Sequence, residues 1–283
     1  MSARSATNLL ISCPDRPGIV ATVSRFLYER GANIVEADQY ATQPQGGTFY
    51  MRMAFQGDGI ERGDFERSFT SEVVEPLAME WRLVYPDEPR RVAVLVSRED
   101  HCLLDLLWRG RRGDFDGEVV QVISNHPDHA ADVAAFGVAY EHVPVGDDQR
   151  VAETRMLELL AGKVELVVLA RYMRILSGQF LADVGVPFIN IHHSFLPAFP
   201  GAEPYVRAAE RGVKIIGATA HYVTEELDEG PIIEQDVARV SHRDSAEELA
   251  AIGRDIERTV LARAVRWHLQ DRVIVHENRT VVF

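Results

Sequence analysis

The sequence predicts an α/β protein of two domains, a small first domain with the element order βαββαβ and a larger second domain with a mostly parallel sheet. Three observations lead to this prediction. The 283 residues are enough for two ordinary hydrophobic cores. Two prolines and four charged residues interrupt the apolar pattern between residues 85 and 91. Strands and helices follow one another in a different order on the two sides of that break. We therefore expect domains at 1–85 and 86–283.

The first domain is predicted from the apolar periods in the order in which they occur. A short apolar strand at 9–12 leads into a turn-rich loop, and Pro17 can open a helix because a first turn does not need its missing N–H. Helical spacing puts five apolar residues on one face of this helix, which Gly31 ends. These five residues are Ile19, Val20, Val23, Phe26 and Leu27. Two strands, a second amphipathic helix and a last strand are then expected at 33–42, 48–55, 65–77 and 81–85.

The second domain is predicted from uniformly apolar runs that are separated by helical segments. Such runs occupy 92–97, 119–124, 164–170 and 188–192, with a further strand at 217–223. Strands without polar alternation, joined by helices, are typical of a parallel sheet that helices cover on both faces. A capping box at 245–248 predicts the start of a long helix, and 272–283 reads as a closing hairpin. Ligands of such sheets bind beyond the carboxyl ends of the strands.

Composition excludes several classes of function. The net charge of −13 opposes non-specific binding to nucleic acid. No apolar run approaches the roughly 20 residues that cross a bilayer. The first residues lack the apolar core of a signal peptide, so we expect a cytoplasmic protein without a membrane partner. Cys13 and Cys102 have neither metal-ligand nor redox-pair spacing, and no metal site is expected.

The first turn and the element order of the first domain resemble those of an ACT domain, a ferredoxin-like module that often senses amino acids. The turn reads Cys-Pro-Asp-Arg-Pro-Gly-Ile-Val over 13–20. The resemblance implies glycine or methionine as effector, with Asp15, Gly18 and the neighbouring Asn33 as contacts. Backbone N–H groups at the helix start can receive a carboxylate. A dimerisation unit without a ligand is the alternative. Because sheets of this kind pair edge to edge, we expect a homo-oligomer.

A second group of polar residues follows the strands of the larger domain. Asn190 and His192 end the apolar strand at 188–192, and residues two apart on a strand project to the same side. His193 is then expected to point elsewhere or to enter the following loop. Alone, an Asn-x-His pair more often indicates a hydrogen-bonded structural pair than a catalytic one. Asp228 stands in a turn before Ile-Ile-Glu-Gln at 232–235, and an acid in such a turn is usually only a turn former.

Three motifs in a fixed order give these residues a more specific meaning. They read Asn-Ile-His-x-Ser-x-Leu-Pro at 190–197, Gly-x-Thr-x-His at 217–221 and Asp-x-Gly-Pro-Ile-Ile-x-Gln at 228–235. Together they resemble the catalytic domain of the folate-dependent formyltransferases, which has a Rossmann-like sheet, over roughly the last two hundred residues. The resemblance implies that the catalytic residues are Asn190, His192 and Asp228.

The resemblance also implies a folate pocket. The segment 169–177 corresponds to the one that receives the pterin, which implies that Met173, Arg174 and Leu176 line the pocket, while the loop before Asp228 closes the other side. An ordinary strand-to-helix connection is the alternative for this segment. His221 is a candidate for a position behind the catalytic residues, although a packed strand histidine is the commoner case.

The chemistry of formyl transfer agrees with these assignments. Attack on the formyl carbon puts negative charge on its oxygen, to which the Asn190 amide can donate without changing its protonation. His192 can donate to the same oxygen or carry a proton to the departing nitrogen. Asp228 can orient and deprotonate an attacking water, especially if burial raises its pKa.

The acceptor of the formyl group is predicted to be water. Family members that formylate glycinamide ribonucleotide carry a glycine-rich phosphate loop after the first strand, whereas this chain has Ser-Arg-Glu-Asp-His-Cys at 97–102. With the ACT-like module, the chain resembles the formyltetrahydrofolate deformylases, the hydrolytic members of the group. The expected reaction converts 10-formyltetrahydrofolate and water to formate and tetrahydrofolate for one-carbon and purine metabolism, without a cofactor. The alternatives are a formyltransferase with an amine acceptor, such as a nucleotide sugar, and a catalytically silent amino-acid-binding regulator.

Overall fold

The structure is a computed structural model that describes residues 6–43, 46–57, 61–86, 90–197 and 204–283. The chain forms two compact units. The first unit contains Met1–Pro89 together with Asp271–Ile274 and Val281–Phe283, and the second contains Arg90–Gln270 with Val275–Thr280. Residues 87–89 of the expected break lie outside the described residues. The division into domains at 1–85 and 86–283 stays a prediction.

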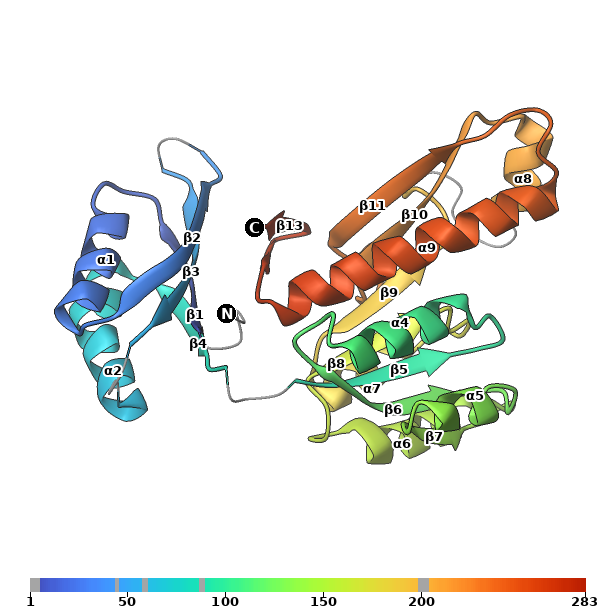
Figure 1. Ribbon diagram of the computed structural model, residues 1–283, viewed down its shortest axis with the longest axis horizontal. Helices are drawn as coiled ribbons and strands as arrows, with labels where there is room; N and C mark the ends of the chain where they lie inside the picture. The colour runs from blue at the N-terminus through green and yellow to red at the C-terminus, as the bar shows by residue number, and fades with distance from the viewer. Residues whose placement is uncertain (1–5, 44–45, 58–60, 87–89, 198–203) are drawn as a thin grey trace. The chain divides into compact units, whose positions relative to one another are not determined.

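The first unit has the predicted order βαββαβ, and Figure 1 shows its helices in blue and cyan on one face of the sheet. The sheet has the strand order β2-β3-β1-β4, with β3 antiparallel to both β1 and β2. The predicted second helix is present as three consecutive pieces, the middle one a π-helix. The elements are β1 (Thr7–Pro14), α1 (Ile19–Glu29), β2 (Asn33–Ala41), β3 (Thr48–Gln56), α2 (Arg62–Phe69), η2 (Thr70–Val74), α3 (Glu75–Leu77) and β4 (Glu80–Val84).

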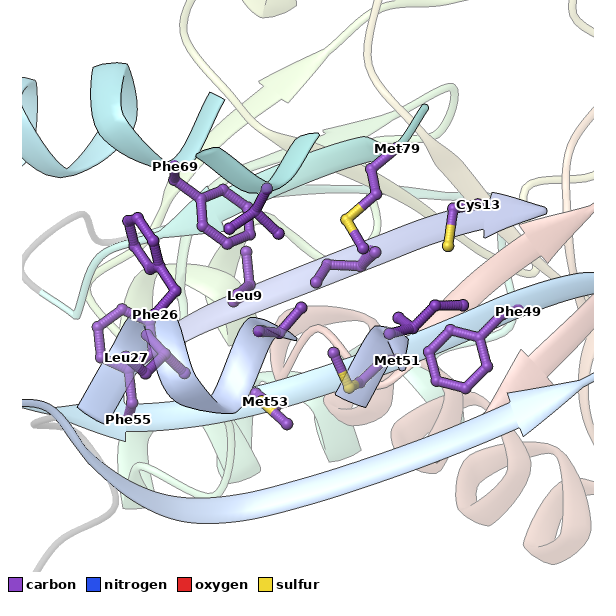
Figure 2. Close-up of a cluster of buried hydrophobic side chains, with 14 of the residues drawn as sticks. Leu9, Cys13, Phe26, Leu27, Phe49, Met51, Met53, Phe55, Phe69 and Met79 are labelled. Carbon is purple, nitrogen blue, oxygen red and sulfur yellow. The ribbon is translucent and has the colours of Figure 1, made fainter. Parts of the chain in front are cut away.

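Aromatic rings pack with aliphatic and methionine side chains in the core between these helices and the sheet (Figure 2). The ring of Phe69 is fully buried and lies 5.1 Å from both Phe26 and Trp81 between centroids. Edge-to-face pairs of this kind add to the stabilisation from burial itself. Two details of α1 differ from the prediction. The helix begins at Ile19 rather than Pro17, and Val20 is 38 % exposed because the buried stripe is narrower than the apolar pattern.

The second unit contains the predicted, mostly parallel sheet, in the order β11-β10-β9-β8-β5-β6-β7. Neighbours from β9 to β7 are parallel, while β10 is antiparallel to both β9 and β11. The sequence did not predict β11, and it missed β7, whose short run has a single apolar residue besides alanine. The elements are β5 (Arg91–Val96), α4 (His101–Arg112), β6 (Glu118–Ser124), α5 (Ala130–Ala135), β7 (Ala139–His142), α6 (Gln149–Leu160), β8 (Leu166–Ala170), α7 (Gly178–Val184), β9 (Phe188–His192), α8 (Pro204–Arg211), β10 (Ile215–Tyr222), β11 (Ile232–Arg239), α9 (Ala246–Leu269), β12 (Val273–His276) and β13 (Arg279–Val282).

Helices cover both faces of this sheet, which explains why its central strands are uniformly apolar. On one face α6 and α7 pack Met156, Leu160 and Phe180 against the strands. On the other, α9, the long red helix of Figure 1, begins at the predicted capping box, where the Ser245 side chain accepts from the Glu248 N–H. No helix in the described parts of the chain is long and apolar enough to cross a membrane. The carboxyl ends of β5, β8 and β9 meet at one edge of the sheet.

Candidate active site

The antiparallel pairing of β9 with β10 brings the predicted polar residues of the two strands together. Asn190 is directly opposite His221, and His192 is opposite Thr219. Opposed residues on paired strands share a face, so Asn190 and His221 meet side chain to side chain. The Nδ2 atom of Asn190 lies 3.2 Å from Nε2 of His221. Asn190 and His192 line one pocket, as the two-residue alternation predicted.

The tautomer of His221 orients the Asn190 amide. Nδ1 of His221 lies 2.9 Å from the carbonyl oxygen of Tyr222 and can only donate to it. In a neutral ring Nε2 is then the acceptor, so it receives an N–H from Asn190. The second N–H of that amide is left for another partner. His221 thus lies behind Asn190, whereas the sequence favoured a packed strand histidine over this position.

Asp228 stands against both histidines. Its Oδ2 lies 3.2 Å from Nδ1 of His192, and its Oδ1 lies 3.6 Å from Nε2 of His221. Asp228 has a φ of 57°, a left-handed conformation that is uncommon for residues other than glycine, Asn and Asp. The loop that follows β10 therefore bends sharply at the residue whose carboxylate it delivers.

The pKa of Asp228 is shifted in the direction opposite to the one that the sequence suggested. Burial raises the pKa of this carboxyl group, but the neighbouring imidazoles, His192 first and His221 second, outweigh burial and hold the pKa well below its ordinary value. The expectation of a raised pKa is wrong because the sequence did not show that two imidazoles flank the carboxylate.

The three sequence motifs are tied to one another by the hydroxyl of Thr219. This buried hydroxyl donates to the carbonyl oxygen of Ser194 at 2.9 Å and accepts from the N–H of Leu196 at 3.0 Å. It also accepts from the side chain of Gln235 at 2.9 Å, and Gln235 in turn donates to the Leu196 carbonyl at 3.0 Å. The polar residues of these motifs that have no catalytic role therefore fix the position of the chain that follows His192.

A cavity of about 260 Å³ lies beside these residues. One wall is the segment 171–176, and the other is the loop 223–228. All three residues predicted to contact folate line it: Met173 is 55 % exposed, Arg174 is exposed, and Leu176 packs mainly into the core. Arg171 and Ile175 also line it and were not singled out from the sequence. Their position after an apolar strand was the available signal.

His193 lies in the loop after β9, one of the two positions expected from the sequence, and it also lines the same pocket. It packs against His192, with 5.2 Å between ring centroids. Burial and the neighbouring charge of Arg171 lower the pKa of His193 to about 4. His193 is therefore neutral near pH 7 and adds no positive charge beside His192.

Comparisons with known proteins show the family to which the chain belongs. A family model described as formyl transferase matches residues 90–265, and a model described as ACT domain matches residues 7–62. A formyltetrahydrofolate deformylase of Mycobacterium tuberculosis is 58 % identical over 97 % of this chain and 90 % of its own length. One of Bacillus subtilis is 53 % identical over 97 % of this chain and 93 % of its own length. The chain belongs to the formyltetrahydrofolate deformylase family.

Solved structures extend this comparison. A deformylase from Pseudomonas syringae has a TM-score of 0.94 and 48 % identity, covering 98 % of this chain and 94 % of its own. A glycinamide ribonucleotide transformylase from Symbiobacterium toebii has a TM-score of 0.66 and 32 % identity, over 71 % of this chain and 98 % of its own. Membership of the deformylase family confirms the predicted ACT-like and formyltransferase-like folds.

One of the three expected effector contacts, Asn33, lies apart from Asp15 and Gly18. Asp15 follows β1 where that strand pairs with Thr48, whereas Asn33 pairs with Gln56 at the other end of β3. These ends are about 25 Å apart at the usual rise per residue. The expectation that Asn33 lies near the first turn is therefore wrong within one chain. Helix α1 returns the chain to the opposite end of the sheet before Asn33 is reached. Gly18 precedes α1 with a φ of 96°.

A buried ionic cluster lies next to the pocket of this deformylase family member. Glu257 of α9, which is 1 % exposed, accepts from Tyr205 at 2.7 Å and from Nε2 of His101 at 2.8 Å. Its Oε2 is also 3.5 Å from Nε of Arg171. Burial raises the pKa of Glu257, but these partners outweigh burial and lower it. The sequence missed Glu257 because an acid on an amphipathic helix is usually exposed.

This cluster includes the one group, among the described residues, whose potential metal ligands all lie within 4.8 Å of one another: His101, Cys102 and Glu257. The guanidinium of Arg171 already pairs with Glu257 and would repel a cation. Burial raises the pKa of Cys102 far above its ordinary value, which also disfavours a thiolate ligand. That the chain binds no metal stays a prediction.

Gly230 should be essential for the position of Asp228. A Cβ atom at Gly230 would lie 1.8 Å from the backbone oxygen of Tyr222, so Gly230→Ala must displace the loop. We expect turnover to fall by about 10²-fold, because a displacement of about 1 Å at a catalytic group can cost that much. Steady-state kinetics of Gly230→Ala measure the effect. Gly146→Ala is the matched control, since nothing lies within 4 Å of a Cβ there. Equal activities of the two variants would contradict the proposed constraint.

Proposed function

We propose that the protein hydrolyses 10-formyltetrahydrofolate to formate and tetrahydrofolate at the pocket beside Asp228. The observation that carries this proposal is the contact of one carboxylate with two imidazoles, next to an oriented Asn190 amide. Relatives that are 53–58 % identical over nearly the whole chain are named formyltetrahydrofolate deformylases. Hydrolysis would supply formate and tetrahydrofolate to one-carbon and purine metabolism.

Each catalytic residue has a role that its contacts support. The free N–H of Asn190 donates to the formyl oxygen as negative charge develops on it. Asp228 orients the attacking water and withdraws its proton. His192 delivers a proton to the departing nitrogen of tetrahydrofolate. The bond between that nitrogen and the formyl carbon then breaks, and the new bond between the water oxygen and the formyl carbon remains in formate.

The low pKa of Asp228 means that this carboxylate alone is a weak base. Nδ1 of His192 lies 3.2 Å from Oδ2 of Asp228, so a proton taken from water can pass between the two side chains. The same pair can then return the proton to the leaving nitrogen. His221 keeps the Asn190 amide turned toward the substrate and also contacts Asp228.

Water is the proposed acceptor because the segment after β5 is unsuited to a phosphate. The Ser97 hydroxyl is buried and accepts from the Met173 N–H at 2.9 Å, while it donates to Asn125 at 2.7 Å. The exposed Glu99 and Asp100 follow at the start of α4, where their charges oppose an anion. An enzyme that formylates a phosphorylated amine would need groups at this position that attract a phosphate. A cytoplasmic location and the absence of a cofactor stay predictions.

The first test is the release of formate without an amine acceptor. The purified protein should convert 10-formyltetrahydrofolate to tetrahydrofolate and formate in buffer alone, followed by absorbance and by a formate assay. Turnover that begins only after an amine acceptor is added would identify a transferase. No turnover under either condition would favour the regulatory alternative.

Asp228→Asn should lower turnover by about 10²-fold or more and leave folate binding nearly unchanged, because it removes the proton acceptor alone. Asparagine tolerates the left-handed backbone at this position, so the loop is expected to keep its shape. Asp147→Asn, in an exposed loop, is the control. If Asp228→Asn has near-wild-type turnover in steady-state assays, Asp228 does not act as the proton acceptor.

We also propose that the first unit binds a small amino acid at the turn that contains Asp15 and Gly18, without Asn33. The N–H groups at the start of α1 suit a carboxylate, and Asp15 suits an ammonium group. Strand β2 lies at an edge of its sheet with Val35 and Tyr40 half exposed, which supports pairing with a second copy.

Glycine or methionine should therefore shift either the melting temperature or the rate of the protein. Asp15→Ala should abolish the shift, while Asp64→Ala, an exposed acid of α2, should retain it. Differential scanning fluorimetry and rate assays with each amino acid provide the measurement. If neither amino acid changes either quantity in the wild type, the effector proposal is wrong.

A further inference from the structure

The pocket segment 171–176 ends at a buried carboxylate that the catalytic roles do not use. Glu153 lies on α6 and is 7 % exposed. Its Oε1 accepts from the backbone N–H of Ser177 at 2.8 Å, and its Oε2 accepts from the Ser177 hydroxyl at 2.7 Å. Ser177 is the residue at which the pocket segment ends and α7 begins. The carboxylate therefore holds one end of the pocket wall.

Gln149, one turn earlier on α6, adds a second attachment. Its side-chain amide donates to Oε1 of Glu153 and to the carbonyl oxygen of Ile175, each at 2.7 Å. Ile175 is 63 % exposed and lines the pocket. Gln149 thus links Glu153 by hydrogen bonds to the middle of the pocket wall.

The other end of the segment is held by Ser97. The Ser97 N–H donates to the Arg171 carbonyl at 3.2 Å, and the Ser97 hydroxyl accepts from the Met173 N–H at 2.9 Å. The segment therefore spans two fixed points, with exposed apolar side chains and backbone groups between them. Loss of either point would leave a loop that must be ordered again whenever a ligand binds.

A role in folding alone does not account for Glu153. Its neighbours on the buried side of α6 are apolar, namely Ala152, Met156 and Leu160. A carboxylate among them carries a desolvation cost, and an apolar side chain of similar volume often stabilises such a site equally well. The particular gain from a carboxylate is that it can accept three hydrogen bonds at once, two from Ser177 at the end of the pocket wall and one from Gln149.

We infer that Glu153, acting with Gln149, is a positioning residue that pre-organises the pocket wall 171–176 for the ring system of the folate. The inference rests on the proposed function for the identity of the ligand. It separates two tasks within the site. The residues around Asp228 perform the chemistry, whereas α6 fixes the affinity for folate by keeping the wall ordered in the empty enzyme.

Glu153→Met tests this inference, because methionine keeps the length and fills the apolar space while it removes the acceptor. We expect KM for 10-formyltetrahydrofolate and Kd for tetrahydrofolate to rise about tenfold, with kcat within about threefold. Gln149→Ala should show a smaller rise of the same kind. Glu153→Gln retains an acceptor for the Ser177 N–H and should restore both constants to within about threefold. Glu158→Gln, an exposed acid on the same helix, is the control.

Titration calorimetry with tetrahydrofolate and steady-state kinetics give the two constants, and circular dichroism verifies folding. Wild-type KM and Kd in folded Glu153→Met would overturn the inference, and so would a fall in kcat at constant KM. Glu153→Gln that binds as weakly as Glu153→Met would overturn it too. If Glu153→Met does not fold, unchanged constants in Gln149→Ala are decisive against it. Tetrahydrofolate binding that weakens in these variants, in a protein that releases no formate, would refute the hydrolysis and leave the inference standing.

Discussion

The buried hydroxyl of Thr219 holds the three parts of the active site in register. It joins β10 to the backbone that follows His192 and to the side chain of Gln235 on β11. Because it donates once and accepts twice, every hydrogen-bonding group that meets there is satisfied. The pairing of β10 with β9 then sets His221 opposite Asn190. A slip of one residue would turn each of these side chains to the other face of the sheet.

The sequence predicted the parts of the site that follow from strand periodicity. Asn190 and His192 share a pocket because residues two apart on a strand do so, and the pocket forms where strands end. It did not predict the contributions of Glu153 and Glu257. Both lie on helices where acids normally face solvent, and both are buried because partners from distant segments donate to them. Such partners are fixed only by the tertiary fold.

Electrostatics and topology account for two of the expectations that were wrong. Burial alone would raise the pKa of Asp228, but the fold supplies two imidazoles whose opposing effect is larger. Along the sequence, Asn33 is separated from the first turn by little more than helix α1. The crossover through α1 places it at the far end of the sheet instead. In both cases the chemical properties of the residues were judged correctly, but the error came from the positions of their neighbours in the folded chain.

The two units are not separable at a single point of the chain. Asp271 follows α9, yet it belongs to the first unit, where it is 2 % exposed. Its carboxylate accepts from Asn8 at 3.1 Å and from Arg82 at 3.0 Å. A fragment cut after residue 89 would leave both donors without this acceptor. Exchanging the amino-terminal module between relatives would therefore require carrying over the segment that contains Asp271 as well.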